Sequence, residues 1–174
     1  MDLRQTYRAR WRVDHSLFAL LAVAVALSVG GCDSGGPTVT PTPIAGTRDH
    51  PREVNIIARE YAFAPPIVDL IPDETVLIHV VNAGLDVHEA VIGDMAVQDA
   101  WEVAEAAVAG APPGPTPLVS VPPGQAGLRV VVQSGQRVDV LWTVPDATIP
   151  LIVGCHIPGH WAKGMQVPVQ FVGP

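Results

Sequence analysis

The sequence predicts an all-β fold: an antiparallel β-sandwich of seven or eight strands, with one short helix in a long connection. Three observations support this prediction. The 174 residues include 18 Pro and 16 Gly, spread along the chain, which excludes most long helices. Short apolar segments alternate with turn residues. Apolar residues make up 48% of the chain, enough for a core, and the length fits one domain plus a tail.

Residues 1–31 have the pattern of a secretory signal peptide. Four arginines precede an apolar run of 13 residues, 17–29, which is shorter than the roughly 20 residues of a membrane span. The run ends in Leu27-Ser28-Val29-Gly30-Gly31-Cys32, which resembles a bacterial lipobox. That resemblance implies cleavage before Cys32, lipidation of Cys32 and anchoring on the outer, periplasmic side of the cytoplasmic membrane. A plain signal peptide with a coincidental Cys is the alternative.

Residues 32–52 are predicted to be a flexible tether, and residues 53–174 the folded domain. The tether segment contains Ser-Gly-Gly-Pro and Thr-Val-Thr-Pro-Thr-Pro, which bury too little apolar surface to offset the entropy of ordering. A tether after a lipidated Cys would let the domain reach away from the membrane surface.

In the first half of the domain, strands are expected where apolar and β-branched residues alternate or run together. Val54, Ile56 and Ala58 alternate with their neighbours, and a turn follows at Pro65-Pro66. The remaining segments in this half are a short strand at 67–71, a central strand at 75–81, a turn at 82–84 and the segment 85–92.

The second half contains the helix and the last strands. Apolar residues recur at helical spacing in 97–109, which predicts one amphipathic helix that starts near Asp94 and stops at Gly110, with Trp101 as a packing residue. Strands are expected at 128–133, 137–144, 149–154 and 166–172. Pro168 predicts an edge position or a bulge for the last of them, because proline cannot donate a ladder hydrogen bond.

The charge of the domain excludes one class of partner. The net charge is −7, and after residue 31 there are 15 acidic and 6 basic residues, a balance of −9. Nucleic-acid binding needs Lys and Arg for phosphate contacts, so we expect no nucleic-acid partner. An acidic surface suits a basic protein partner or simply serves solubility.

The candidate metal ligands lie in one segment near the C-terminus. Its sequence is Cys155-His156-Ile157-Pro158-Gly159-His160-Trp161-Ala162-Lys163-Gly164-Met165. A thiolate, imidazoles and a weakly held Met sulfur are the ligands of a trigonal blue-copper site. Such a site takes two imidazoles, and His88 is the candidate for the second. Cys155 would end a strand, and Pro158 and Gly159 would turn the chain so that His160 and Met165 face the same point.

Other interpretations of these residues remain open. His79 is a rival ligand, although its place inside an apolar strand favours core packing; His156 should point away from Cys155; Met95 is a second possible axial ligand. A Cys32–Cys155 disulfide would leave no free thiol. Two His and a Cys could also hold catalytic zinc, and a Cys–His pair could act as a nucleophile, but no general base or oxyanion element accompanies them.

The eleven-residue segment resembles the ligand loop of the cupredoxins, and its C-x4-H-x4-M spacing is most similar to that of rusticyanin and sulfocyanin. The segment Asn82-x-Gly84-x3-His88 resembles the first-His region of the same family. The resemblance implies a Greek-key β-sandwich with one type 1 copper ion, held by His88, Cys155 and His160 in the plane and Met165 on the axis. Glu89 departs from the family, whose members often have Asn or Ser after the first His.

We therefore expect a copper protein that carries single electrons outside the cytoplasm, and not an enzyme. Its expected partners are redox proteins, such as a respiratory complex, a cytochrome or an oxidase, with the membrane reached through the lipid. A monomer is expected. The alternative is a chaperone or scavenger that delivers copper to an oxidase.

Overall fold

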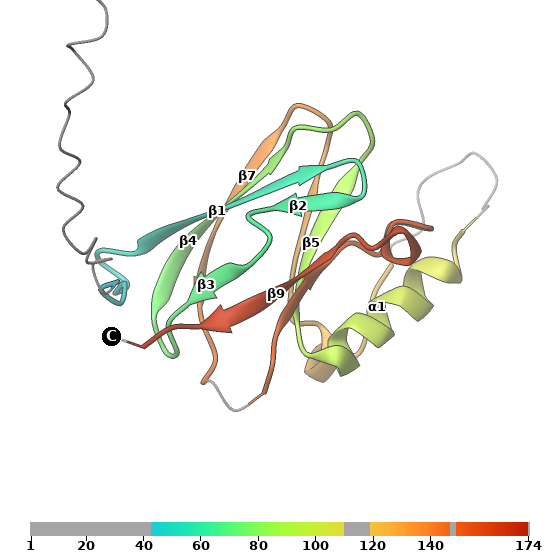
Figure 1. Ribbon diagram of the computed structural model, residues 1–174. Coiled ribbons are helices and arrows are strands. Elements are labelled where there is room, and N and C mark those ends of the chain that lie inside the picture. The colour runs from blue at the N-terminus through green and yellow to red at the C-terminus, as the bar shows by residue number, and fades with distance from the viewer. Residues whose placement is uncertain (1–42, 110–118, 147–148, 174) are drawn as a thin grey trace, which may run out of the picture. The chain divides into compact units, whose positions relative to one another are not determined.

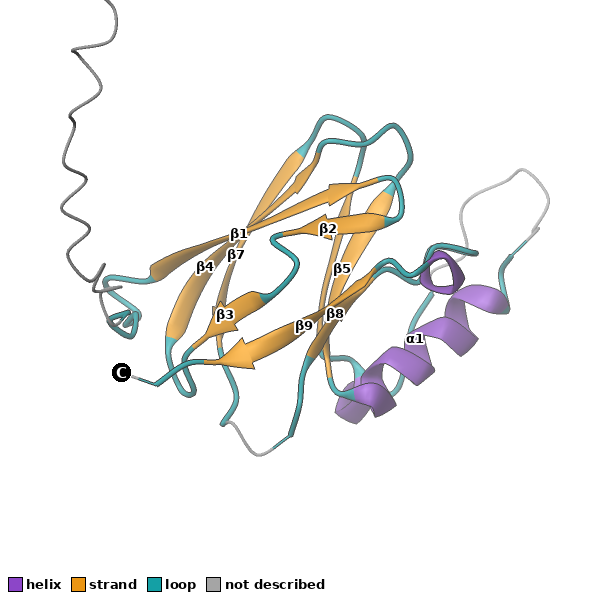
Figure 2. Ribbon diagram, in the orientation of Figure 1, coloured by secondary structure: helices purple, strands orange, loops and turns teal. Residues whose placement is uncertain are grey.

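The computed structural model describes residues 43–109, 119–146 and 149–173. These residues form two β-sheets that pack face to face, with a short helix against one of them (Figure 1; Figure 2). The predicted β-sandwich with one helix is confirmed. The predicted signal peptide, Cys32 and the tether up to residue 42 lie outside the described residues. The helices that are described are too short or too polar for a transmembrane span.

The two sheets have four and five strands. The first has the order β2-β1-β4-β7 and is formed by β1 (Arg52–Arg59), β2 (Ala62–Ala64), β4 (Thr75–Asn82) and β7 (Arg137–Thr143). The second has the order β3-β9-β8-β5-β6 and is formed by β3 (Val68–Leu70), β5 (His88–Gly93), β6 (Leu128–Val132), β8 (Ile152–Gly154) and β9 (Gln166–Phe171). The helical elements are α1 (Met95–Ala106) and the 3₁₀ turns η1 (Pro123–Gln125) and η2 (Trp161–Lys163).

The expectation of a purely antiparallel sandwich is wrong for two strand pairs. Strand β1 runs parallel to β4, and β3 runs parallel to β9. The cause is the path of the chain: after the β1–β2 hairpin it adds β3 to the second sheet and then returns beside β1 in the same direction. The described residues contain nine strands, whereas seven or eight were expected. The additional strand is β2, which the sequence does not indicate because it has only three residues and shows no alternation of its own.

The core lies between the sheets, on one face of each strand. Val54, Ile56 and Ala58 of β1 are at most 7% exposed, as their alternation predicted. Strand β4 contributes Ile78 and Val80 to the same core cluster. This alternation fixes which side chains point inward, because successive residues of a strand face opposite ways.

Helix α1 lies in the long connection between β5 and β6. It begins at Met95, where the side chain of Asp94 caps it by accepting a hydrogen bond from the amide of Val97, and ends at Ala106, a few residues before the predicted stop. The Trp101 ring is 6% exposed and its Nε1 donates to the carbonyl of Ala126, so its predicted packing role is confirmed.

The expected edge position of the last strand is wrong for the strand as a whole. β9 lies between β3 and β8. Pro168 pairs with Ile152 of β8, whereas pairing with β3 begins only at Val169. The missing N–H of Pro168 therefore costs no bond to β3, because the proline precedes the stretch that β3 covers.

A buried ion pair holds the start of the described chain to the sandwich. Glu74 is 1% exposed and accepts hydrogen bonds from the side chain of Arg52 and from the amides of Gly46 and Ile71. The amide of Thr75 donates to the carbonyl of Gly46. Ordered contacts thus begin at Gly46, inside the range predicted as tether.

The acid limb of the stability curve should depend on Glu74. Burial opposes its charge, but the hydrogen bonds from Arg52 and the two amides outweigh burial and lower the pKa of Glu74 below its ordinary value. Its contribution is therefore present above the unfolded-state pKa and is lost as the pH falls through the folded-state pKa. We expect Glu74→Gln to lower the free energy of unfolding at neutral pH by about 2 kcal/mol.

Urea unfolding of both proteins from neutral to strongly acidic pH measures this effect. The difference between them should shrink toward low pH, where Glu74 of the wild type becomes protonated. A difference that stays constant across the range would contradict the role of the charge.

Candidate metal centre

Cys155 directly follows the last residue of β8 and is fully buried. Its amide donates to the carbonyl of Met165 at 3.1 Å, which joins the two ends of the predicted ligand loop. The sulfur accepts hydrogen bonds from the backbone amides of Glu89 and Ile157. Cys155 is the free cysteine among the described residues. The sulfur is therefore held at a defined position in the core.

The loop from Cys155 to Met165 closes through local backbone bonds. The amide of His160 donates to the carbonyl of Ile157, and the amide of Met165 donates to the carbonyl of His160. Gly159 has φ +86, a left-handed conformation that residues with a Cβ rarely adopt. The turn predicted at Pro158-Gly159 is confirmed. It returns His160 (6% exposed) and Met165 (fully buried) toward Cys155.

His88 opens β5 and is positioned by the segment before it. The Asn82 side chain is buried; its Oδ1 accepts from the amide of Gly84, and its Nδ2 donates to the carbonyls of Asp86 and Val132. A Cβ on Gly84 would lie 2.9 Å from Nε2 of His88. A side chain at position 84 would therefore displace the His88 ring.

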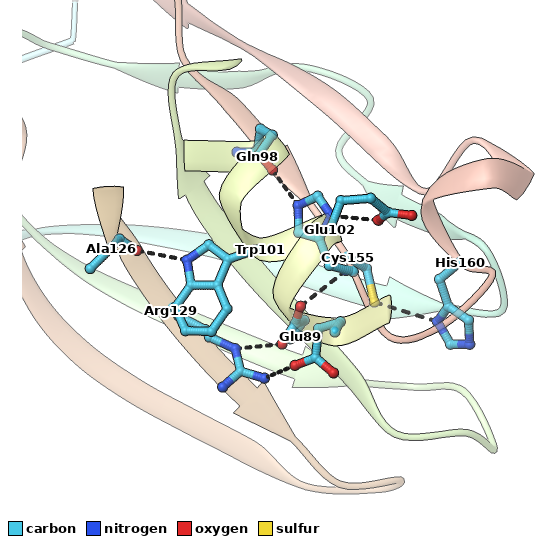
Figure 3. Close-up of polar contacts among 10 residues, drawn as sticks. Glu89, Gln98, Trp101, Glu102, Ala126, Arg129, Cys155 and His160 are labelled. Atoms are coloured by element: carbon cyan, nitrogen blue, oxygen red, sulfur yellow. Dashed lines mark hydrogen bonds and ion pairs between the residues drawn. The ribbon is translucent and has the colours of Figure 1, made fainter. Parts of the chain in front are cut away.

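The structure brings three of the four predicted ligands together. Donor atoms of His88, Cys155 and His160 lie within 4.8 Å of one another. The two Nδ1 atoms are 3.2 Å apart, and Nδ1 of His160 is 3.4 Å from Sγ of Cys155 (the latter contact is drawn in Figure 3). Among the described residues, Nε2 of His88 has no hydrogen-bond partner. The predicted convergence at one end of the sandwich is confirmed.

Burial controls the protonation of these groups. It raises the pKa of the Cys155 thiol to about 12, and it lowers the pKa of His88 and of His160. Without a metal, the thiol is therefore protonated and both imidazoles are neutral at neutral pH. A cation at this position would take the place of the thiol proton, because a metal ligand must be deprotonated.

The donor set fits a trigonal copper site better than its competitors. One thiolate, two imidazoles and a thioether are the ligands of that geometry. No carboxylate belongs to the group among the described residues, so the general base expected of catalytic zinc is not part of it. A nucleophilic Cys needs a lowered pKa, whereas that of Cys155 is raised.

The rival ligands lie elsewhere. Met95 begins α1 and is 48% exposed. His79 is buried, but the prediction of core packing is wrong: it alternates with Ile78 and Val80 and so faces away from the core. On that outer face its Nδ1 lies 2.8 Å from Oδ1 of Asp139. The polar side chains of Glu53, Asp139 and Arg137 contact it there.

His156 points away from the metal site, as predicted. Its Nδ1 contacts Glu102 at 2.9 Å and its Nε2 contacts Gln98 at 2.7 Å, both on α1 (Figure 3). Its ring stacks on Trp161, with centroids 4.8 Å apart. In addition, the backbone amide of His156 donates a hydrogen bond to Oε1 of Glu89 at 3.0 Å. This arrangement fixes the peptide that follows Cys155.

Sequence reasoning missed two groups beside the site. Tyr61 lies in the β1–β2 hairpin at φ 59, its ring edge-on to His160, with Nζ of Lys163 3.6 Å from the ring centroid. Arg129 pairs with Glu89 and Glu105. An arginine within the otherwise apolar strand Leu128–Val132 was the available signal for a buried ion pair.

Comparison with known proteins identifies the fold. No family model and no curated protein matches the chain. Among solved structures, auracyanin of Roseiflexus castenholzii has a TM-score of 0.55 at 19% identity, over 74% of this chain and 99% of its own. Auracyanin A, described as a "blue" copper protein of Chloroflexus aurantiacus, has 0.55 at 21%, over 71% and 99%. An azurin of Methylomonas sp. strain J has 0.54 at 16%, over 69% and 97%. The described domain therefore has the cupredoxin fold.

The buried thiol should be unreactive in the metal-free protein. In a Cys32→Ser background, iodoacetamide should alkylate Cys155 slowly at neutral pH, with a rate that keeps rising toward pH 12, because burial both raises the thiol pKa and restricts access. The same chain unfolded in urea is the control and should react with the ordinary thiol pKa of about 8.5. Rapid alkylation of the folded chain at neutral pH would contradict the description of the site.

Proposed function

We propose that this protein is a type 1 copper protein that carries single electrons. His88, Cys155 and His160 would hold the ion, and Met165 would be the axial ligand. The observation that carries the proposal is the convergence of one thiol and two imidazoles in a buried position of a cupredoxin fold. The printed description of auracyanin A as a "blue" copper protein supports the choice of copper.

The surrounding residues suit electron transfer. Copper, when bound, supplies a one-electron redox couple. The chain supplies a rigid, dry donor set: the ligand-loop backbone bonds fix Cys155, His160 and Met165, and Asn82 fixes the segment before His88. Ligands that cannot move far need little rearrangement between the two oxidation states, and low rearrangement favours fast transfer.

The location and partners form a further part of the proposal. Residues 1–31 would be a lipoprotein signal peptide, a lipid on Cys32 would anchor the protein on the periplasmic side of the cell membrane, and the following segment would tether the domain. The partners would be redox proteins such as a respiratory complex, a cytochrome or an oxidase, met by a monomer. The lipobox-like sequence before Cys32 and the acidic balance of the domain support this proposal.

Within the cupredoxins, we place the ligand loop nearest to rusticyanin and sulfocyanin. The support is the C-x4-H-x4-M spacing of Cys155, His160 and Met165.

The copper-loaded, oxidised protein should show an intense visible thiolate-to-Cu(II) band. Cys155→Ser should abolish that band because it removes the thiolate, while far-UV circular dichroism stays that of a folded β protein. His79→Gln is the matched control: it removes a buried histidine that lies outside the group and should keep the colour. Copper bound without such a band, held as Cu(I) and released to an acceptor, would contradict the carrier and support copper delivery.

Membrane anchoring should depend on Cys32. In a bacterial host that processes lipoproteins, the wild type should sediment with membranes, and Cys32→Ser should lose the lipid and move to the soluble fraction or remain as an unprocessed precursor. Cys155→Ser, which removes the other cysteine, should stay lipidated and in the membrane fraction. If the wild type, Cys32→Ser and Cys155→Ser fractionate alike and show no difference in mass from a lipid, the anchoring proposal is contradicted.

A further inference from the structure

Glu89 contacts both the Cys155 sulfur and the peptide group that follows Cys155. It follows His88 in β5 and is fully buried. Its backbone amide donates to Sγ of Cys155, and Oε1 of its carboxylate accepts from the amide of His156 at 3.0 Å. The Glu89 carboxylate thus holds the peptide group that follows Cys155 (Figure 3).

Arg129 holds the other oxygen of this carboxylate. Its Nε lies 2.6 Å from Oε2 of Glu89, and its Nη2 lies 2.6 Å from Oε1 of Glu105 on α1. The guanidinium also stacks over the Trp101 ring, 4.4 Å from the centroid. Two carboxylates share one guanidinium, so Arg129 is not available to Glu89 alone; burial raises the pKa of Glu105, the member of the pair on α1.

We propose that Glu89 is a positioning residue for the Cys155 thiolate and that its charge, only partly offset by Arg129, lowers the reduction potential of the centre. This inference rests on the copper site proposed above. A buried negative charge favours the more positive oxidation state of a nearby metal, because the interior screens charges weakly. A neutral side chain at position 89 could hold the His156 amide but would not supply this field.

A second buried ion pair, outside the proposed copper site, provides a matched control. Glu74 and Arg52 form a second buried ion pair, with side chains 0% and 24% exposed, against 0% and 23% for Glu89 and Arg129. Glu74 precedes the first residue of β4, whereas Asn82 beside the metal site is the last. Glu74 and Asn82 are thus about 25 Å apart along β4, which places Glu74 at the opposite end of that strand from the segment before His88 and too far for a strong effect on the sulfur.

The test compares Glu89→Gln, Glu105→Gln and Glu74→Gln in the full chain. With copper bound, Glu89→Gln should shift the reduction potential upward and keep the visible band, since Gln retains an acceptor for the His156 amide. Glu105→Gln should give a smaller upward shift, because its carboxylate reaches the site only through Arg129. Glu74→Gln should leave the potential unchanged although it loses a comparable ion pair.

A second measurement needs no metal. In a Cys32→Ser background, Glu89→Ala removes the acceptor of the His156 amide and should speed alkylation of Cys155 by about tenfold, the equivalent of one hydrogen bond. Glu89→Gln should restore most of the protection, and Glu74→Ala should have no such effect at matched stability. Should Glu89→Ala fail to fold, the comparison between Gln variants decides.

Two outcomes would overturn the inference: equal potentials for Glu89→Gln and Glu74→Gln, or equal alkylation rates for Glu89→Ala and Glu74→Ala. The failure of the copper proposal would look different. In that case the wild type itself would lack the visible band, while the alkylation rates would still report whether Glu89 positions Cys155.

Discussion

The sulfur of Cys155 lies in the core, where a negative charge is stable only if donors and cations surround it. Two kinds of group surround the sulfur. Amides of Glu89 and Ile157 point at the sulfur, and the imidazoles of His88 and His160 face the same space. The raised thiol pKa shows that these donors do not suffice alone. A bound metal cation would supply the missing positive charge and stabilise the Cys155 thiolate. The Cys155 site therefore depends on a cation that the chain itself does not supply.

The division of the proposed ligands between two parts of the chain follows from the sandwich topology. Cys155, His160 and Met165 belong to one short connection between β8 and β9, where local backbone bonds set their geometry. His88 comes from β5, which pairs with β8. Because β5 and β8 are neighbours, their side-by-side ends place a distant histidine beside the loop without any special connection.

Local patterns in the sequence predicted the parts of this structure that depend on local physics. The ligand loop, the start of α1 near Asp94 and the core face of β1 all follow from spacing, turn residues and alternation. The parallel pairings and the short strand β2 were not predictable, because they depend on which distant strands meet. The same holds for His79: its burial was predicted, but its neighbours across the sheet, such as Asp139, come from the register with β7.

The connection that contains α1 joins β5 to β6, and its two ends lie side by side because Ile92 of β5 pairs with Leu128 of β6. Its ends meet whatever its length, and lengthening such a loop adds only slowly to its closure entropy. This part of the chain can therefore gain or lose residues over evolution without disturbing the ladder between β5 and β6. What such changes would alter is the set of side chains that α1 offers to His156 and Arg129, and therefore the contacts that hold the peptide after Cys155.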